Sequence, residues 1–392
     1  MTGSVIVSGV RTPIGKFQGA LGGFTATQLG GIAIREALAR AGVTGDQLDY
    51  VIMGHVLQAG QGQITARQAA VAGDVPMEVP AITINKVCLS GLNAVHLADA
   101  LIRAGEMGIA LAGGMESMTN APYALPKARA GFRMGNGSVV DLMIHDGLWC
   151  AFDKCHMGES SDRMNATLGI DRIAQDEWAA RSHERAAEAA KAGRLSDEIV
   201  AIEVPQRKGD PARIEEDEGI RPGATAESLG KLSPAFAKDG TITAGNASQI
   251  SDGAAALVVT SAQKAAALGL EPLAQIVAHG QVSGPDPSLH LQPANAIRMA
   301  AAKAGLDPAS LDLYEINEAF ASVAIASARE LGISEDKINV NGGAVALGHP
   351  IGMSGARLVL TAIHELRRRG GGVAVAALCG GGGQGDALIV RV

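Results

Sequence analysis

An internal repeat restricts the possible folds of this chain more than any other feature of its sequence. Residues 33–42, AIREALARAG, are identical to residues 296–305, AIRMAAAKAG, at seven of ten positions. At the same offset of 263 residues, DYVIMGH (49–55) aligns with DLYEINE (312–318). Two alanine-rich helices could match by chance, but further elements continue the match.

The match resumes at an offset of 264 residues. The Ser-Gly step at 90–91 and the helix-like run after it align with the Ser-Gly step at 354–355 and the run that ends at Gly370. The strand-like segment IALAGG (109–114) then has its counterpart in VAALCGG (375–381). Four elements in the same order over about 80 residues indicate two halves with one shared topology.

Strand-like and helix-like segments alternate in the first half. Residues 4–10 are expected to form a buried strand, 27–42 a helix that ends at Gly42, and 49–56 a second strand. Segments in this order predict an α/β fold with a parallel sheet that has helices on its faces. With 47% hydrophobic and 19% charged residues, the chain has enough apolar surface for a large packed core.

A segment of different composition, residues 119–249, separates the two halves. Proline, glycine and charged residues become more frequent there, and the helix-like run over 176–194 is polar enough to be a solvated face. Such an insertion is a natural cover for a substrate site. We therefore predict an N-terminal half (1–118 with 250–271), a loop domain (119–249) over the site, and a C-terminal half (272–392).

Charge and segment lengths argue against several classes of protein. The net charge of −7 disfavours general nucleic-acid binding, and no apolar stretch reaches the ~18–20 residues of a membrane span. The first residues lack the basic and apolar regions of a signal peptide. Four irregularly spaced cysteines do not form a disulfide framework, so a reducing cytoplasm is the expected location.

Cys88 lies in KVCLSG, directly before a helix that we expect to begin near Ser90. Backbone N–H groups and the helix dipole favour an anion at such a position, so we expect the thiol pKa to be lowered. A thiolate there could form a covalent thioester. A buried structural cysteine explains the segment equally well, because free cysteines are commonly buried. This segment alone leaves both interpretations open.

His349 and Cys379 strengthen the catalytic interpretation. His349 precedes the repeated helix, and Cys379 ends a strand at a four-glycine turn. Both occupy connection ends of α/β units, where open sheets place their sites, and two related halves would bring these ends close to Cys88. The glycines favour backbone N–H groups that approach a substrate oxygen. A dinucleotide site is disfavoured, because the seven residues after GGGGQG leave no room for the helix and the acidic residue that such a site requires.

Cys150 and Cys155 stand beside His156, a combination that raises the question of a metal site. Four residues separate the two cysteines, and the sequence offers no second pair of ligands next to them. We therefore expect two ordinary cysteines and no metal site.

The motifs together resemble the thiolase family, in its acetyl-CoA acetyltransferase branch. The resemblance covers essentially the whole chain. It rests on CLSG from Cys88, NEAF (317–320), GHPIGMSG from 348 and CGGGGQG from 379, together with RTPIGKF (11–17), GGMESM (113–118) and GNASQISDGAAA (245–256). It implies a thiolase fold, in which two similar α/β halves form a five-layered α/β/α/β/α core with an inserted loop domain.

The resemblance also implies a reaction and its catalytic residues. The reaction would be the ping-pong Claisen condensation of two acetyl-CoA molecules to acetoacetyl-CoA and CoA, with thiolysis as its reverse. Cys88 would be the acylated nucleophile, His349 its base and Cys379 the acid/base at the substrate α-carbon. Asn317 would hold a water that forms one oxyanion hole with His349. The backbone N–H groups of Cys88 and Gly381 would form the other.

Coenzyme A would be bound as a substrate, without any resident cofactor. The substrate-binding residues implied by the resemblance are Leu148, His156, Met157, Arg221, Ser228, Ser248, Leu289, Ala319 and Phe320. Of these, Ser248 would contact the pantetheine and Arg221 the adenine. The resemblance further implies a dimer or a tetramer, and we expect a homotetramer built as a dimer of dimers.

Four alternatives remain at this stage, of which a decarboxylating ketosynthase is disfavoured because it would use a cysteine with two histidines and leave the second cysteine idle. Lys86-Val87 and the stretch GPDPSLHLQP (284–293) depart from the commonest short-chain patterns, so a degradative 3-ketoacyl-CoA thiolase of broader chain length is the nearest rival. A non-catalytic lipid carrier on the same scaffold would be expected to lack a catalytic residue, yet all four are present. A thiol redox protein would instead join Cys88 and Cys379 in a reversible disulfide.

Overall fold

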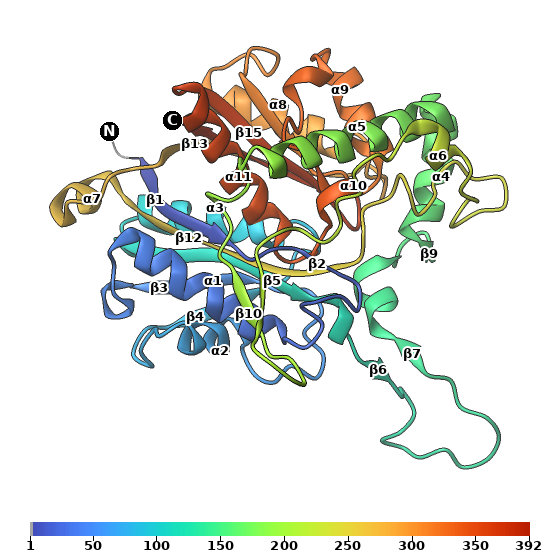
Figure 1. Cartoon of the computed structure of the whole chain (residues 1–392), viewed down its shortest axis with the longest axis horizontal. Coiled ribbons are helices and arrows are strands. Elements are labelled where there is room, and N and C mark those ends of the chain that lie inside the picture. Colours follow the sequence, from blue (N-terminus) through green and yellow to red (C-terminus); the bar gives the residue numbers. More distant parts are fainter. Residues whose placement is uncertain (1–2) are drawn as a thin grey trace.

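The computed structural model describes residues 3–392 and contains one large mixed sheet (Figure 1). In chain order, its strands are β1 (Ser4–Arg11), β2 (Gly15–Lys16), β3 (Tyr50–Gly54), β4 (Ala81–Ile84), β5 (Ile109–Ser117), β12 (Ser251–Ser261), β13 (Ala274–Ser283), β14 (Leu313–Ile316), β15 (Val373–Gly380) and β16 (Gln384–Arg391). Their spatial order is β14-β15-β16-β13-β1-β12-β5-β3-β4, with β2 paired to β12.

The two halves of the sheet have the same arrangement. The order β1-β12-β5-β3 in one half is repeated as β13-β16-β15-β14 in the other. Tyr50 of β3 pairs with Ala110 of β5, and Leu313 of β14 pairs with Ala374 of β15, in parallel strands. These pairs correspond at offsets of 263 and 264 residues, so the sequence repeat is confirmed in strand register.

Helices form three layers around the two half-sheets. The outer and central layers consist of α1 (Ala26–Ala41) and α2 (Thr65–Ala72) on the first half, α8 (Gln292–Ala304) and α9 (Ala321–Leu331) on the second, and α3 (Ser90–Arg103) and α11 (Ser354–Arg369) between them. Both α3 and α11 contact strands of both halves. The expected α/β/α/β/α fold is therefore confirmed. As predicted, α1 ends at Gly42, which caps it with a left-handed φ of 66°.

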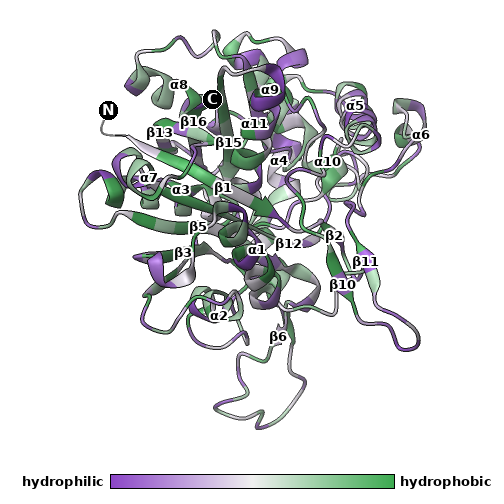
Figure 2. Ribbon diagram, turned by 60° about the vertical axis from the view of Figure 1, so that its left-hand side comes forward, coloured by the Kyte–Doolittle hydropathy of each residue, from purple (hydrophilic) through white to green (hydrophobic). Residues whose placement is uncertain are grey.

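The expectation of a parallel sheet is wrong at the centre of the molecule. β12 runs antiparallel to β1 and β5, and β16 runs antiparallel to β13 and β15. β12 follows the long insertion, so no crossover helix fixes its direction. The half-sheets are joined by antiparallel β1 and β13 through only two pairs, Val5 with Gln275 and Ile6 with Ala274. In Figure 2 the central strands are mostly hydrophobic, in agreement with their burial.

The insertion adds short elements around one edge of the core. Its hairpins are β6 (Tyr123–Ala124) with β7 (Val140–Asp141), β8 (Trp149–Cys150) with β9 (Cys155–His156), and β10 (Ile202–Val204) with β11 (Ala212–Ile214). Its helices are the π-helical turn η3 (Met143–Leu148), α4 (Met157–Leu168), α5 (Arg172–Lys191) and α6 (Ala226–Gly230). The other short helices are α7 (Ala262–Leu268), α10 (Ala344–Leu347), η1 (Gly45–Gln47), η2 (Met118–Asn120) and η4 (Glu335–Lys337). The proposed domain boundaries stay predictions.

The helix predicted over 176–194 is α5, and it is not a wholly solvated helix. It is hydrophilic along much of its length (Figure 2), but Trp178 and Ser182 are buried. Trp178 Nε1 and Ser182 Oγ donate to the carboxylate of Glu318 at 2.9 and 2.8 Å. This contact fixes α5 to the C-terminal half, directly after Asn317. None of the helices in residues 3–392 has the length and apolar character needed to cross a membrane.

Candidate active site

A cavity of about 460 Å³ lies where connections from both halves meet the insertion. All predicted site residues except Asn317 and Ser228 line it, namely Cys88, Leu148, His156, Met157, Arg221, Ser248, Leu289, Ala319, Phe320, His349, Cys379 and Gly381. The structure therefore brings the two predicted reactive sulfurs and the histidine into one space. Another, more open hollow of about 600 Å³, lined by residues such as Asp162 and Lys238, contains none of the predicted residues.

Cys88 lies in the turn between β4 and α3. Val87 has a left-handed φ of 51°, which is unusual for a β-branched residue. Ser90 holds this turn, because its Oγ accepts from the backbone N–H of Lys86 at 2.8 Å and donates to the carbonyl of Val87 at 2.6 Å. Lys86 Nζ also binds Asp386 of β16 at 2.7 Å. The turn is therefore fixed both locally and to the other half.

His349 lies in the loop between α10 and α11. Gly348 has a φ of 110°, and a Cβ there would collide with the Ser251 side chain, so the loop requires glycine at this position. The Nδ1 atom of His349 lies 2.6 Å from Ser354 Oγ, which also donates to the Pro350 carbonyl at 3.0 Å. These contacts assign the proton to Nδ1 and leave Nε2 as an acceptor.

Asn317 is buried, does not line the cavity and contacts His349. It follows β14, and its backbone N–H donates to the Ala377 carbonyl of β15 at 2.9 Å. Its Nδ2 lies 3.3 Å from His349 Nε2. Its Oδ1 is buried and has no hydrogen-bond partner among residues 3–392. Asn317 thus has a polar atom available beside His349.

Cys379 lies near the end of β15 in a second apolar cluster. Its neighbours in this cluster include Leu289, Phe320 and Val323. The glycine turn follows directly. A Cβ on Gly381 would lie 3.5 Å from Val87 Cγ1 and 3.6 Å from Met157 Sδ. Gly381 therefore sits between the nucleophile turn and the start of α4.

Burial controls the protonation of the three reactive groups. It raises the pKa of Cys88 to about 12, with a further rise from the charge of Glu116 and an opposing backbone hydrogen bond. Burial also raises the pKa of Cys379, and charge on Cys88 raises it further. Burial and then the charge of Arg357 lower the pKa of His349 to about 3. At neutral pH the site therefore holds two thiols and a neutral imidazole.

The expected lowering of the Cys88 pKa by the start of α3 is therefore wrong. The Cys88 side chain is only 5% exposed and packs with Val56, Leu57, Met118 and Ile351. In such surroundings the loss of water disfavours the thiolate more than the N-terminal amides favour it. The sequence showed the start of the helix but could not show the apolar cluster, because its members come from distant segments.

The insertion supplies an aromatic wall opposite the reactive groups. His156 caps α4, with its Nδ1 accepting from the Gly158 N–H at 3.3 Å. Its ring lies 4.6 Å from the ring of Phe236, which meets Phe320 edge-on at 6.0 Å. Burial lowers the pKa of His156, which favours the neutral ring. The wall is therefore apolar close to the sulfurs.

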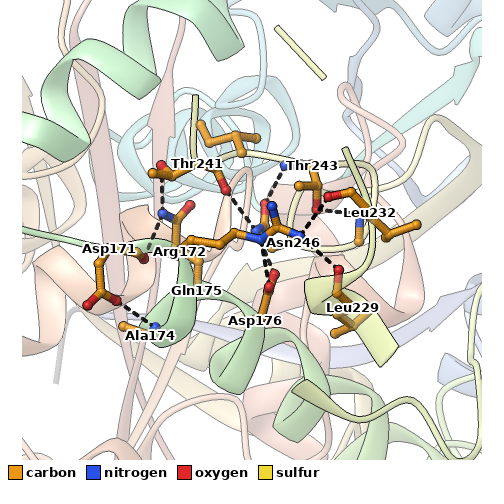
Figure 3. A network of polar contacts seen from close by, with 12 residues as sticks. Asp171, Arg172, Ala174, Gln175, Asp176, Leu229, Leu232, Thr241, Thr243 and Asn246 are labelled. Carbon is orange, nitrogen blue, oxygen red and sulfur yellow. Dashed lines mark hydrogen bonds and ion pairs between the residues drawn. The ribbon is translucent and has the colours of Figure 1, made fainter. Parts of the chain in front are cut away.

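The GNAS segment is held in place by a polar network (Figure 3). Asn246 Nδ2 donates to Asp176 of α5 at 2.9 Å and to the Thr241 carbonyl at 3.1 Å. Asp176 in turn binds Arg172 at 2.6 Å. The next turn places Ser248 against NEAF, because its N–H and Oγ both donate to the Ala319 carbonyl, at 3.1 and 3.0 Å.

Two predicted substrate residues lie farther from the reactive groups. Arg221 is exposed and lines the cavity, with its N–H donating to His183 Nδ1 at 3.2 Å. Ser228 is outside the cavity lining: it is exposed on α6, where its Oγ donates to the Thr225 carbonyl at 2.9 Å. The local sequence favours this helix cap, so the Ser228 hydroxyl forms its hydrogen bond within its own turn.

Sequence reasoning missed several residues that shape the site. Ser354 could have been found, because the repeat aligns it with Ser90 at the start of the matching helix. Glu116 lies in the GGMESM motif, and its carboxylate accepts from the N–H groups of Val56 and Gly352 at 3.1 and 3.0 Å. Phe236 had no sequence signal, since it lies in an irregular polar segment.

The fold and cavity define an α/β protein in which two related halves contribute thiols and a histidine to one buried site. Family models match the chain as the thiolase N-terminal domain over residues 4–263 and the thiolase C-terminal domain over residues 270–392. The chain therefore belongs to the thiolase family, a family of acyltransferases, and the predicted resemblance is confirmed.

Full-length relatives agree with this assignment. A protein of Mycolicibacterium smegmatis named probable acetyl-CoA acetyltransferase is 57% identical over 387 residues, or 99% of this chain and 100% of its own length. A protein of Mycobacterium tuberculosis with the same name is 56% identical over 391 residues, covering 100% of both chains. An acetyl-CoA acetyltransferase of Cupriavidus necator is 51% identical over 392 residues, again covering 100% of both.

Proposed function

We propose that this protein is an acetyl-CoA C-acetyltransferase that condenses two acetyl-CoA molecules to acetoacetyl-CoA and CoA and catalyses the reverse thiolysis. The observation that carries the proposal is the meeting of Cys88, Cys379 and His349 in one cavity. The names of the full-length relatives support the acetyl-CoA specificity. CoA is a substrate in this proposal, and no resident cofactor takes part.

The first half-reaction transfers an acetyl group to Cys88. Its Sγ attacks the thioester carbonyl while its proton passes to His349 Nε2, and CoA then leaves with that proton. The raised pKa of Cys88 and lowered pKa of His349 disfavour a preformed ion pair, so proton transfer accompanies formation of the carbon–sulfur bond. Ser354 keeps the ring oriented through Nδ1.

The second half-reaction forms the carbon–carbon bond. Cys379 passes its thiol proton to the neutral His349 as it removes an α-proton from the second acetyl-CoA, and the resulting carbanion displaces Cys88 from its acetyl group. Cys379 then holds the α-proton, and the proton on His349 passes to the sulfur of Cys88 as that sulfur leaves, which restores two thiols and a neutral imidazole. The raised pKa of Cys379 supports this role, because a more basic thiolate is better matched to a weakly acidic C–H bond.

Oxyanion stabilisation completes the proposed mechanism. Backbone N–H groups of Cys88 and Gly381 stabilise the tetrahedral oxyanion on the acylated cysteine, and Asn317 with His349 stabilises the enolate. Each preorganised donor of this kind is typically worth ~3–4 kcal/mol. The unpartnered Asn317 Oδ1 and the nearby Nδ2 leave this side chain free to orient a water molecule.

Substrate contacts follow the cavity from the sulfurs to its mouth. Met157 and Leu289 bound the acyl end, with Leu148, His156, Ala319 and Phe320 beside them. Ser248 lies along the path of the pantetheine, and Arg221 lies by the adenine. The aromatic wall limits the length of the cavity at its acyl end. It therefore favours substrates with short acyl chains over the long-chain substrates of a degradative thiolase. Thiolysis rates of acetoacetyl-CoA and of a long-chain 3-ketoacyl-CoA separate these two specificities.

A cytoplasmic homotetramer is the proposed state of the protein. The segment between β6 and β7 extends away from the core (Figure 1). It exposes Leu125, Phe132 and Met134, with Met134 90% exposed. Such an apolar extension supports assembly, because contiguous exposed apolar side chains commonly mark interfaces.

Removal of Cys379 should separate the two half-reactions. We expect Cys379→Ala to accept one acetyl group from acetyl-CoA at Cys88, because the nucleophile and His349 remain, but to form no acetoacetyl-CoA. Intact-protein and peptide mass spectrometry measures the acetylation. Cys88→Ala is the matched control and should take up no acetyl group. A Cys379→Ala enzyme that folds but stays unmodified would contradict the assigned roles.

A further inference from the structure

A hairpin of the insertion places two cysteines that the proposed reaction does not use face to face. β8 pairs with β9, and Cys150 is directly opposite Cys155. Residues opposite each other in antiparallel strands have Cα atoms about 4.5 or 5.5 Å apart, and disulfides join Cα atoms about 4.4–6.8 Å apart. Both cysteines are free and buried. The strand register therefore places the two cysteines where a cross-strand disulfide can form.

Both sulfurs also have hydrogen-bond donors beside them. Arg163 Nη2 of α4 donates to Cys155 Sγ at 3.1 Å, and the Asp153 N–H donates to Cys150 Sγ at 3.3 Å. Thiol–disulfide exchange also requires that the attacking sulfur be accessible to its reagent. The loop of residues 151–154 is exposed, so a small reagent has a short path to Cys155.

The hairpin borders the cavity through His156 and the glycine turn through Phe152. Alternate residues of a strand point to opposite faces, so the sulfurs lie on the face opposite to the Trp149–His156 pair. A bond between them therefore leaves His156 in the cavity wall. At the tip, a Phe152 ring carbon lies 3.1 Å from the position of a Cβ on Gly382. The tip thus touches the turn that follows Cys379.

We propose that Cys150 and Cys155 form a redox modification site that takes low-molecular-weight disulfides as its reagent. The Cys155 thiolate attacks one sulfur of the reagent and releases one thiol, which leaves a mixed disulfide. The Cys150 thiolate then attacks Cys155 Sγ and releases the second thiol. The reagent gains two electrons and the two cysteine protons, and the protein gains one intramolecular disulfide that restrains the hairpin. Cys88 and Cys379 take no part.

Non-reducing peptide mapping of the full-length wild-type enzyme tests the proposal. After incubation with oxidised glutathione and blocking of remaining thiols, trypsin cuts after Lys154, between the two cysteines. We expect peptides 134–154 and 155–163 to appear as one linked species that dithiothreitol separates. Peptides 87–103 and 370–391 carry Cys88 and Cys379, so any pairing of those cysteines is detected separately.

Two outcomes would overturn the proposal. One is a map in which Cys150 and Cys155 carry only glutathione or the blocking reagent. The other is a map in which either cysteine is linked to peptide 87–103 or 370–391. Cys150→Ser is the matched variant and should stop at a mixed disulfide on Cys155 without any linked peptides. Because the wild-type map does not depend on activity, its result is separate from the fate of the proposed acyl transfer.

Discussion

The turn that carries Cys88 and the turn that carries His349 are counterparts in the internal repeat. At the offset of 264 residues, Ser90 aligns with Ser354, and each serine is the first residue of its helix. Each hydroxyl donates to a backbone carbonyl of its own turn, Ser90 to Val87 at 2.6 Å and Ser354 to Pro350 at 3.0 Å. One scaffold therefore holds two different reactive groups.

The difference between the turns lies in which position carries a reactive side chain. Cys88 aligns with Gly352, whose Cβ would lie 2.7 Å from the Met115 carbonyl oxygen and 2.8 Å from Glu116 Oε2. Asn317, at the offset of 263, aligns with Gly54, whose Cβ would lie 2.8 Å from the Gly352 carbonyl oxygen. The chain packs so closely around Gly352 and Gly54 that neither position has room for a side chain. Close packing thus makes the two halves chemically unequal.

Alanine substitution of the two counterpart serines should give the largest measurable difference between the two halves. Ser354 contacts the ring of the proposed base His349, so Ser354→Ala should lower kcat by about 100-fold, within the range for orienting partners of functional histidines. Ser90 binds only backbone groups, so Ser90→Ala should mainly lower the free energy of unfolding, by about 1 kcal/mol. Steady-state kinetics measures kcat and urea unfolding measures the free energy of unfolding for both variants. A larger loss of kcat in Ser90→Ala than in Ser354→Ala would contradict this prediction.

Adding a methyl group at Gly352 should test the packing argument. The added Cβ meets the Met115 backbone oxygen, which cannot move away cheaply, so we expect Gly352→Ala to destabilise the protein by about 2 kcal/mol. Gly23→Ala is the control, because a Cβ there meets nothing within 4 Å, and it should change stability by less than about 0.5 kcal/mol. Equal urea midpoints for the two variants would show that the contact is not tight.

Acid sensitivity should come from buried histidines of the C-terminal half. Burial lowers the pKa of His290 to about 4, whereas the unfolded ring binds a proton near pH 6.5. The resulting stability is complete above pH 6.5 and is lost as the pH falls toward 4. At pH 5.5, this one ring should lower the free energy of unfolding by about 1.4 kcal/mol, because it binds a proton only in the unfolded chain. Urea unfolding at pH 5.5 and 7.5 measures the loss.

His290→Gln provides the control for this pH dependence. His290 Nε2 contacts Asn165 Oδ1 at 2.7 Å, and glutamine keeps a polar group there without a titrating ring. The difference in unfolding free energy between pH 5.5 and 7.5 should therefore shrink in this variant. An undiminished difference would assign the acid sensitivity to other groups, His349 among them.

Local sequence patterns predicted much of the fold and the reactive groups of the site. The repeat predicted the shared topology, and Gly42 marked the end of α1. Cys88, His349 and Cys379 could be found because each stands beside glycines or a helix start at a strand connection. The β1–β13 junction could not be found, because two residue pairs between distant strands leave no periodic signal. The buried face of α5 was missed for a related reason, since its contact with Glu318 depends on tertiary packing.

The sequence by itself determined that two related α/β halves would meet and which thiols and imidazole they would carry. Both follow from patterns along the chain, namely hydrophobic periodicity, turn residues and the repeat. Only the tertiary structure decided the protonation of these groups, the glycines imposed by close packing, and the pairing of Cys150 with Cys155. Burial and contact depend on atoms from distant segments, and the order of residues along a chain does not fix which of them come together.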